Sequence, residues 1–343
     1  MNRPRDDAIG EVASVSVIPI KRIRRFLWDE CVEEPYASSN IHTMKSFSLI
    51  TPASFKFWPT VYSHGWCDLR PFAIDKEAEH LDTVLRLSDA SLCAVRLREG
   101  KNGIRIQVLA PDSPESSHNS EIKTIVAQMF RLAEPMDEFY ARARREPDFR
   151  WVAKSGGGRL LRTQTVFEDL VKMICTTNCS WALTKIMTDN LTMLLGSEVS
   201  EGMYSFPEPV AIAAQTESFM RKEIRCGYRA PYLLEFAESV ASGRRQIEHW
   251  RAWEGTTDDL FNEMRSVKGV GEYAAGALMK LLGRYEYLGL DSWCRSKFYE
   301  LHARDKVVSD EKIKKYYAPF RKWRGLFLWM DVTHHWFEKK FPF

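Results

Sequence analysis

The 343-residue sequence contains no apolar run close to the roughly 20 residues that a membrane-spanning helix needs. Its start, MNRPRDDAIG, lacks the apolar stretch of a secretory signal. The seven cysteines include no C-x-x-C pair, which argues against a disulfide framework, a zinc ribbon and a four-cysteine iron–sulfur site. His334 and His335 are adjacent but have no further candidate ligand nearby. We therefore expect a soluble, unexported protein in a reducing compartment, with no metal and no cofactor.

Low-complexity tracts and internal repeats are also absent, and 45% of the residues are hydrophobic, which is far too apolar for a disordered chain. Charge is nearly balanced, with 49 basic against 46 acidic residues. Residues 265–343 nevertheless hold 16 basic against 9 acidic side chains. Such a basic region is typical of proteins that bind a phosphate polymer, although charge clusters also occur on solvated helix faces. The run KRIRR at 21–25 is interpreted as a solvated strand edge, with phosphate contact as the alternative.

The residue pattern predicts an α+β protein, in which a small antiparallel β-sheet domain precedes a larger all-helical domain. Residues 1–44 are interpreted as an N-terminal extension. Residues 45–120 contain short strand-like segments separated by turn signals, one expected helix near 76–87, and a polar linker at 111–120. From residue 121 to 343, apolar residues recur at steps of three and four, which is typical of amphipathic helices.

The most informative segment is 261–298, where two predicted helices meet at the tight link SVKGVG. Gly269 and Gly271 permit positive φ and let the backbone approach another surface closely. Val270 between them is expected to fill the groove between the two helices. Such a link turns backbone N–H groups and the positive end of the second helix outward, toward an anion such as phosphate. The pattern predicts a helix-hairpin-helix, although a tight helical turn without a ligand also fits it.

A single carboxylate follows this hairpin. About twenty residues beyond Gly271, the apolar letters YLGL lead into Asp291, which precedes the predicted helix SWCRSKFYEL. An isolated aspartate in this position is by default a helix N-cap. Because it follows a hairpin at this spacing, a catalytic role is the better interpretation. Asp291 is therefore the candidate catalytic residue.

These features resemble the helix-hairpin-helix (HhH-GPD) DNA glycosylase superfamily, whose mark is a G-[VI]-G hairpin followed by such an aspartate. Segments 165–187, 224–243 and 317–332 are similar to parts of its 8-oxoguanine DNA glycosylase and 3-methyladenine DNA glycosylase II branches. The likeness covers roughly residues 45–335. It implies base-excision repair: a damaged base is flipped out of double-stranded DNA and its N-glycosidic bond is cleaved. Asp291 would stabilise the oxocarbenium-like sugar and orient or deprotonate the attacking water.

One departure from the family pattern concerns the nucleophile. Members that also nick DNA carry a lysine two residues after the second hairpin glycine, and its amine forms a Schiff base with the sugar. Tyr273 occupies that position here. The resemblance therefore implies a monofunctional glycosylase that uses water. Lys268 lies on the other side of the hairpin and is assigned to phosphate contact, with a displaced nucleophile as the alternative.

The resemblance also assigns residues to the DNA interface and to the base pocket. The DNA-binding set consists of the hairpin and one residue that would fill the gap left by the flipped base: Lys268, Gly269, Val270, Gly271 and Asn178. A helix cap is the alternative for Asn178. Tyr273, Trp329 and Trp181 are assigned to the base pocket, where an aromatic ring can stack on an extruded base. Ordinary core packing is the alternative for Tyr273 and Trp329.

The sequence does not decide which damaged base the protein excises, because its features are divided between two branches of the superfamily. The letters GYRAPY at 227–232 favour an 8-oxoguanine or mismatch-directed enzyme, whereas the missing lysine and the N-terminal segment favour alkylated purines. A catalytically inactive DNA-binding repair protein is the alternative from a different class. We expect a monomer directed at alkylated purines in double-stranded DNA, without membrane association. Its location would be the cytoplasm, with the nucleoid, in a bacterium or the nucleus in a eukaryote.

Overall fold

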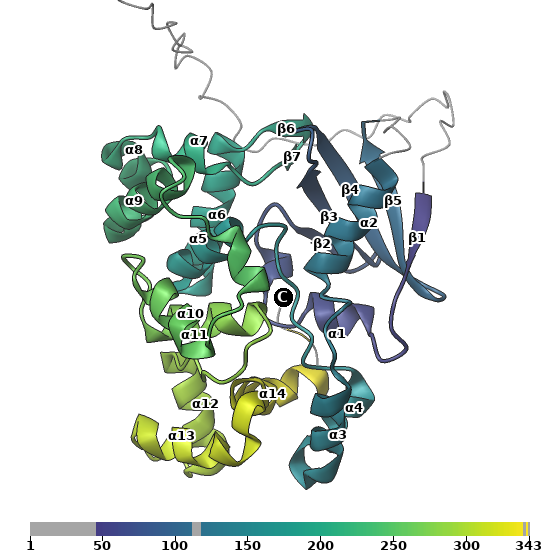
Figure 1. The fold of residues 1–343 in the computed structure, drawn as a ribbon, viewed down its shortest axis with the longest axis vertical. Helices are drawn as coiled ribbons and strands as arrows, with labels where there is room; N and C mark the ends of the chain where they lie inside the picture. The colour runs from purple at the N-terminus through teal and green to yellow at the C-terminus, as the bar shows by residue number, and fades with distance from the viewer. Residues whose placement is uncertain (1–45, 112–117, 339–340, 342–343) are drawn as a thin grey trace, which may run out of the picture. The chain divides into compact units, whose positions relative to one another are not determined.

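The computed structural model describes residues 46–111, 118–338 and 341. The N-terminal extension expected at 1–44, with its basic run, and most of the linker expected at 111–120 lie outside these residues. The described chain begins with an antiparallel sheet and continues mainly as helices (Figure 1). This arrangement confirms the predicted α+β class.

The sheet has five antiparallel strands in the spatial order β1-β5-β4-β3-β2. Their bounds are Ser46–Ile50 for β1, Ala73–Asp75 for β2, His80–Arg86 for β3, Leu92–Gly100 for β4 and Gly103–Ala110 for β5. Alternation along β5 places Ile104, Ile106 and Val108 on the buried face. Leu97 pairs with Ile106, and Val95 pairs with Val108, so apolar side chains of neighbouring strands meet on that face.

The prediction of a helix near residues 76–87 is wrong, because a turn and strand β3 occupy this segment. Leu81, Val84 and Leu85 recur at helical steps. However, β3 pairs with β2 on one side and with β4 on the other, and nearly all of its residues are buried. A strand covered on both faces carries apolar residues without strict alternation, so spacing alone does not distinguish it from a short helix.

The α-helices of the described residues, in chain order, are α1 Phe57–Val61, α2 His118–Met129, α3 Asp137–Arg145, α4 Arg150–Ser155, α5 Val166–Thr176, α6 Trp181–Leu195, α7 Pro209–Ala213, α8 Glu217–Lys222, α9 Ala230–Ala241, α10 Thr257–Arg265, α11 Glu272–Leu281, α12 Ser292–His302, α13 Asp310–Tyr317 and α14 Arg324–Glu338. A two-stranded hairpin, β6 (Glu198–Ser200) and β7 (Met203–Tyr204), follows α6. None of these helices has the length and apolar character needed to cross a bilayer.

Two hydrophobic clusters hold the helices. The first joins the buried face of the sheet, such as Leu97, to Ile125 of α2, Leu170 of α5 and Leu278 of α11. The second packs α14 against α3 and α4, with the ring of Phe327 at 5.2 Å from that of Phe139. The sheet and the helices thus share a continuous core, and the domain boundary expected near residue 120 stays a prediction.

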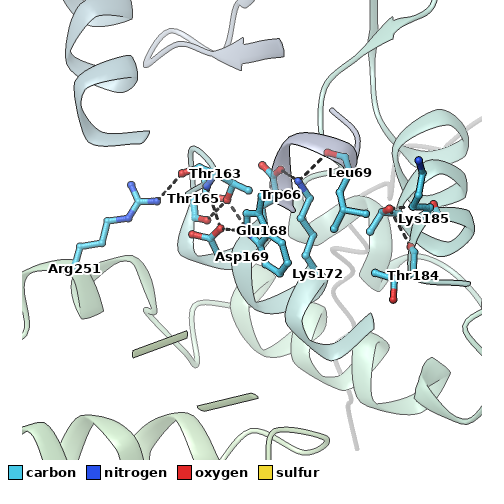
Figure 2. Close-up of polar contacts among 11 residues, drawn as sticks. Trp66, Leu69, Thr163, Thr165, Glu168, Asp169, Lys172, Thr184, Lys185 and Arg251 are labelled. Atoms are coloured by element: carbon cyan, nitrogen blue, oxygen red, sulfur yellow. Dashed lines mark hydrogen bonds and ion pairs between the residues drawn. The ribbon is translucent and has the colours of Figure 1, made fainter. Parts of the chain in front are cut away.

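A buried polar network fixes α5 against the segment between α1 and β2 (Figure 2). Asp169 accepts a hydrogen bond from Trp66 Nε1 at 2.8 Å. The buried Lys172 Nζ lies 2.7 Å from Glu168 Oε1 and donates to the Leu69 carbonyl at 3.4 Å. Burial raises the pKa of Glu168 to about 7, against the opposing charge of Lys172. The network sets the position of α5, whose C-terminal end reaches the cavity described next.

Candidate active site and nucleic-acid interface

A cavity of about 1170 Å³ lies where the link between α10 and α11, the loop before α12 and the C-terminal end of α5 meet. Its lining includes most of the residues that the sequence singles out: Asn178, Lys268, Gly269, Val270, Gly271, Tyr273 and Asp291. Residues more than one hundred positions apart in the sequence therefore contribute to one site. The volume slightly exceeds the roughly 300–1,000 Å³ of typical small-ligand pockets.

The two hairpin glycines have different structural requirements. Gly269 adopts a φ of 85°, and a Cβ added there would lie 2.9 Å from Tyr232 Cδ2, so positive φ and close packing both favour glycine. Gly271 adopts a φ of −88°, and an added Cβ would meet no protein atom within 4 Å. Of the two properties that the sequence pattern attributes to these glycines, positive φ is used at Gly269 only. Gly271 is the N-cap of α11, a position that favours glycine over alanine.

Val270 fills the groove between α10 and α11, as the sequence predicts, because its side chain is 5% exposed and belongs to the main core. Its N–H donates to the Val267 carbonyl at 3.0 Å and is therefore not available to a ligand. Within the described part of the chain, the N–H groups of Gly269 and Gly271 have no protein acceptor. These two groups and the N-terminus of α11 form the outward-facing donor set of the hairpin.

Lys268 lies at the outer side of the same hairpin. Its Nζ forms an ion pair of 2.7 Å with Glu235 Oε2 of α9, and both side chains are exposed. Such an exposed pair contributes little to stability, because water and salt screen it. Lys268 can therefore exchange Glu235 for an external anion at low energetic cost.

Asp291 is the N-cap of α12, and its Oδ1 accepts a hydrogen bond of 2.6 Å from the Cys294 N–H. Its side chain also lines the cavity. The cap fixes one carboxylate oxygen and orients the group, which is compatible with the predicted role toward a ligand.

Tyr273 lies in the first turn of α11, and its hydroxyl is 3.4 Å from Thr176 Oγ1 at the end of α5. Burial raises the pKa of Tyr273 above its usual value, and the negative charge of Asp291 raises it further. The phenol is therefore neutral at physiological pH. It places an aromatic ring and a hydroxyl in the wall next to Asp291.

Asn178 lies in the loop after α5, where it adopts a φ of 46° that is uncommon for residues other than glycine. Its Nδ2 donates to the Tyr228 hydroxyl at 3.3 Å, and that hydroxyl donates to the Thr177 carbonyl at 3.4 Å. Arg229, which is 3% exposed, also donates to the Thr177 carbonyl. The GYRAPY segment thus braces the Asn178 loop, a contact that its letters alone do not indicate.

Two of the expected pocket residues lie outside the lining of this cavity. Trp329 donates from Nε1 to the Ser63 carbonyl at 2.8 Å, and Trp181 donates to Asp68 Oδ2 at 2.9 Å. Their assignment to the base pocket stays a prediction. Trp293 lines the cavity, and its ring centroid lies 6.0 Å from that of Trp329. Sequence reasoning missed Trp293, although its position two residues after Asp291 was a signal.

Residues 46–111 and 118–338 contain no group of three or more His, Cys, Asp or Glu side chains able to hold a metal ion. Their six cysteines are free thiols, of which only Cys179 lines the cavity.

No family model matches the sequence, and no curated protein matches it. Solved structures do match. The 3-methyladenine DNA-glycosylase from Archaeoglobus fulgidus is 18% identical, with 86% of this chain and 99% of that chain covered and a TM-score of 0.66. MBOgg1, solved with a low-affinity DNA ligand, is 19% identical, with coverage of 88% and 99% and a TM-score of 0.67.

The Clostridium acetobutylicum 8-oxoguanine glycosylase/lyase, solved with double-stranded DNA containing cytosine opposite 8-oxoguanine, is also similar. It is 19% identical, with 79% of this chain and 99% of that chain covered and a TM-score of 0.58. These neighbours confirm the resemblance at the level of the fold, which is that of the helix-hairpin-helix DNA glycosylases.

Proposed function

We propose that this protein, which has the fold of the helix-hairpin-helix DNA glycosylases, excises a damaged base from double-stranded DNA. The observation that carries the proposal is the position of Asp291, which lines the cavity that begins at the hairpin. The printed titles of the solved neighbours support it, since they name DNA glycosylases and two of them include DNA. The direct test is release of a free base from damaged duplexes, with Asp291→Asn as the variant that should lose it.

The proposed reaction begins with DNA held at the hairpin. The free N–H groups of Gly269 and Gly271 donate to a backbone phosphate, which the N-terminus of α11 also favours. The damaged base is flipped into the cavity, at a cost of a few kcal/mol. As the glycosidic bond breaks, the base leaves with the bonding electron pair and the sugar becomes cationic. The Asp291 carboxylate stabilises that cation, water adds to the sugar carbon, and the proton of the water passes to Asp291 or solvent.

Water is the proposed nucleophile. Lys268 and Lys314 line the cavity, but neither occupies the position of the Schiff-base lysine. Tyr273 occupies the position of the Schiff-base lysine. Lys268 points to Glu235 on the outer side of the hairpin. Lys280, seven residues beyond Tyr273 on α11, is buried and donates to the Leu288 carbonyl at 2.6 Å. These placements support a monofunctional enzyme.

Borohydride is therefore expected to trap no covalent adduct between the protein and damaged DNA. The products should be intact strands with abasic sites, which break only after alkali is added. Gel electrophoresis with and without borohydride measures both properties. A trapped band that disappears in Lys268→Ala or Lys280→Met would contradict this expectation and identify the amine.

Alkylated purines are the proposed substrates. The rings of Tyr273 and Trp293 in the cavity wall can stack on a base, and the faces of such rings attract cations. Bases such as 3-methyladenine and 7-methylguanine carry a positive charge in DNA, which also weakens the bond to the sugar. A site that offers a carboxylate but no covalent nucleophile suits these bases, because their bond to the sugar is already weakened. Competition between alkylated-base and 8-oxoguanine duplexes tests the choice.

Lys268→Ala is expected to weaken binding to damaged and undamaged duplexes alike and to reduce the slope of log affinity against log salt by about one unit. The reason is that Lys268 would leave Glu235 and neutralise one phosphate. Glu235→Gln is the matched control and should strengthen binding, because it removes the competing carboxylate. Fluorescence anisotropy across a salt series measures both variants. Unchanged slopes in both would place the phosphate contact elsewhere.

A further inference from the structure

Five basic side chains line the cavity, and they differ in what they contact: Arg265, Lys268, Arg295, Lys314 and Arg324. Three of them have oxygen acceptors in the protein, and the guanidinium of Arg265 lies over the Phe261 ring. Within residues 46–111 and 118–338, the Lys314 ammonium has no ion-pair partner and no hydrogen-bond acceptor. Because its side chain is exposed and unpaired, Lys314 is free to bind an anionic ligand.

The nearest candidate partner of Lys314 along the chain is engaged by another residue. Lys314 lies on α13, four residues after Asp310, so the two side chains are neighbours on one helix face and have the order that favours an ion pair. Arg295 of α12 holds both carboxylate oxygens of Asp310 instead: Nε lies 2.8 Å from Oδ1, and Nη2 lies 2.8 Å from Oδ2. This two-pronged contact is the strong geometry of an arginine–carboxylate pair. Arg295 thereby keeps Asp310 from pairing with Lys314.

Arg295 itself is committed to the protein. Its third nitrogen, Nη1, donates to the Leu290 carbonyl at 3.2 Å. Each nitrogen of the guanidinium thus has an acceptor, either on α13 or in the loop directly before Asp291. Arg295 therefore links the start of α13 to the loop that carries Asp291, and Lys314 is the cation of this pair of helices that an external anion can reach.

The backbone that carries Lys314 is well fixed. Ile313 and Tyr317 of α13 are fully buried, and the Tyr317 ring lies 5.9 Å from that of Phe298 on α12. The Lys314 side chain leaves the opposite, exposed part of the helix. Binding of an anion would therefore order one side chain without rearranging the helix, which limits the entropic cost.

We propose that Lys314 binds a backbone phosphate of the DNA, on an element separate from the hairpin, and that Arg295 keeps it free by occupying Asp310. The choice of DNA as the ligand rests on the proposed function. The hairpin offers backbone N–H groups and a helix N-terminus, whereas Lys314 offers a full positive charge on a flexible stem. Phosphate contacts from two separate elements fix the register of a duplex over the cavity and carry no sequence information.

The first test is the salt dependence of DNA binding by Lys314→Ala. Affinity for damaged and undamaged duplexes should fall alike, by about fivefold at about 0.1 M salt, and the slope of log affinity against log salt should fall by about one unit. Lys315→Ala is the matched control, because Lys315 is an exposed lysine of the same helix that does not line the cavity. It should change affinity less than about twofold. A wild-type slope in Lys314→Ala, or equal changes in both variants, would overturn the proposal.

The second test concerns the role of Arg295. In Arg295→Gln, Asp310 is released and can pair with Lys314, so DNA affinity should fall about as far as in Lys314→Ala. The double variant Arg295→Gln/Asp310→Asn removes the competing carboxylate and should recover the affinity and the salt slope of the wild type. It also lacks the ion pair between the helices, so recovery would exclude a loosened α13 as the cause. An unrecovered double variant would overturn the role of Arg295.

Asp310→Asn alone keeps the test decisive if Arg295→Gln does not fold. This variant leaves Lys314 unpaired and removes a negative charge from the cavity lining, so it should bind duplex at least as tightly as the wild type. Weaker binding that follows correct folding, checked by circular dichroism, would overturn the proposal.

Base release separates a failure of this proposal from a failure of the proposed function. A wild type that releases no base, but whose salt slope falls in Lys314→Ala, would overturn the glycosylase activity and support the phosphate contact. A wild type that releases base while Lys314→Ala binds DNA unchanged would overturn the phosphate contact alone. An adduct that borohydride traps in the wild type but not in Lys314→Ala would also overturn it, because the amine would then attack the sugar.

Discussion

Asp291→Asn is expected to reduce base release by at least about a thousandfold while affinity for damaged duplex stays within about threefold. The negative charge of Asp291 matters most when the sugar is cationic, whereas DNA binding depends mainly on the hairpin and on basic side chains. Single-turnover excision and anisotropy on the same duplex measure the two quantities. A variant that excises at the wild-type rate would remove Asp291 from the reaction.

Asparagine is the informative substitution because Asp291 also caps α12. An asparagine oxygen can accept the hydrogen bond from the Cys294 N–H, so the helix start is kept. Alanine would lose that cap and would mix a stability effect of about 1 kcal/mol with the catalytic one. Glu272→Gln is the control, because it removes a carboxylate from the same cavity lining without touching the cap. It should excise within about threefold of the wild-type rate.

The hairpin glycines are expected to separate DNA binding from stability. Gly271→Ala should weaken binding to every duplex by about 10-fold to 100-fold, because a methyl group would keep a phosphate away from the N–H donors. Its melting temperature should fall only slightly, because the added Cβ meets no protein atom within 4 Å and the cost is limited to that of alanine at the N-cap of α11. Gly269→Ala should instead lower the free energy of unfolding by about 1–3 kcal/mol, because it combines a φ of 85° with a contact to the Tyr232 ring.

Thermal unfolding and anisotropy on damaged and undamaged duplexes measure both effects in each variant. Gly271→Ala that unfolds and binds like the wild type would show that the hairpin is only a structural turn. The basic residues of α13 and α14 would then have to hold the DNA by themselves.

Local signals in the sequence were sufficient to locate the hairpin and to place Asp291 at the start of a helix. These signals are the glycine spacing, an apolar Val270 between the glycines, and an aspartate before a helix. They are properties of neighbouring residues, so they can be seen without the fold. The β3 segment was misread because burial on both faces removes the alternation that marks a strand. The sequence could not tell which of the two glycines needs positive φ, because a glycine needed for close approach has the same letter.

Contacts between distant segments could not be predicted from spacing. Lys280 occupies a polar position near the end of an otherwise apolar helix, which is typical of an exposed lysine. Only the fold shows that the Leu288–Gly289 backbone covers it. Likewise, the hydrogen bond from Asn178 Nδ2 to the Tyr228 hydroxyl joins residues 50 positions apart. No periodicity in either segment encodes that contact.

Release of free base by the wild-type protein is the most direct measurement of the proposed activity. Duplexes that each carry one 3-methyladenine, 7-methylguanine, 1,N6-ethenoadenine, hypoxanthine, uracil or 8-oxoguanine are incubated with excess protein, and the released bases are separated by chromatography. We expect free alkylated purine, with an alkali-labile abasic site left in an intact strand. Binding of these duplexes without release of any base would contradict the proposed glycosylase activity.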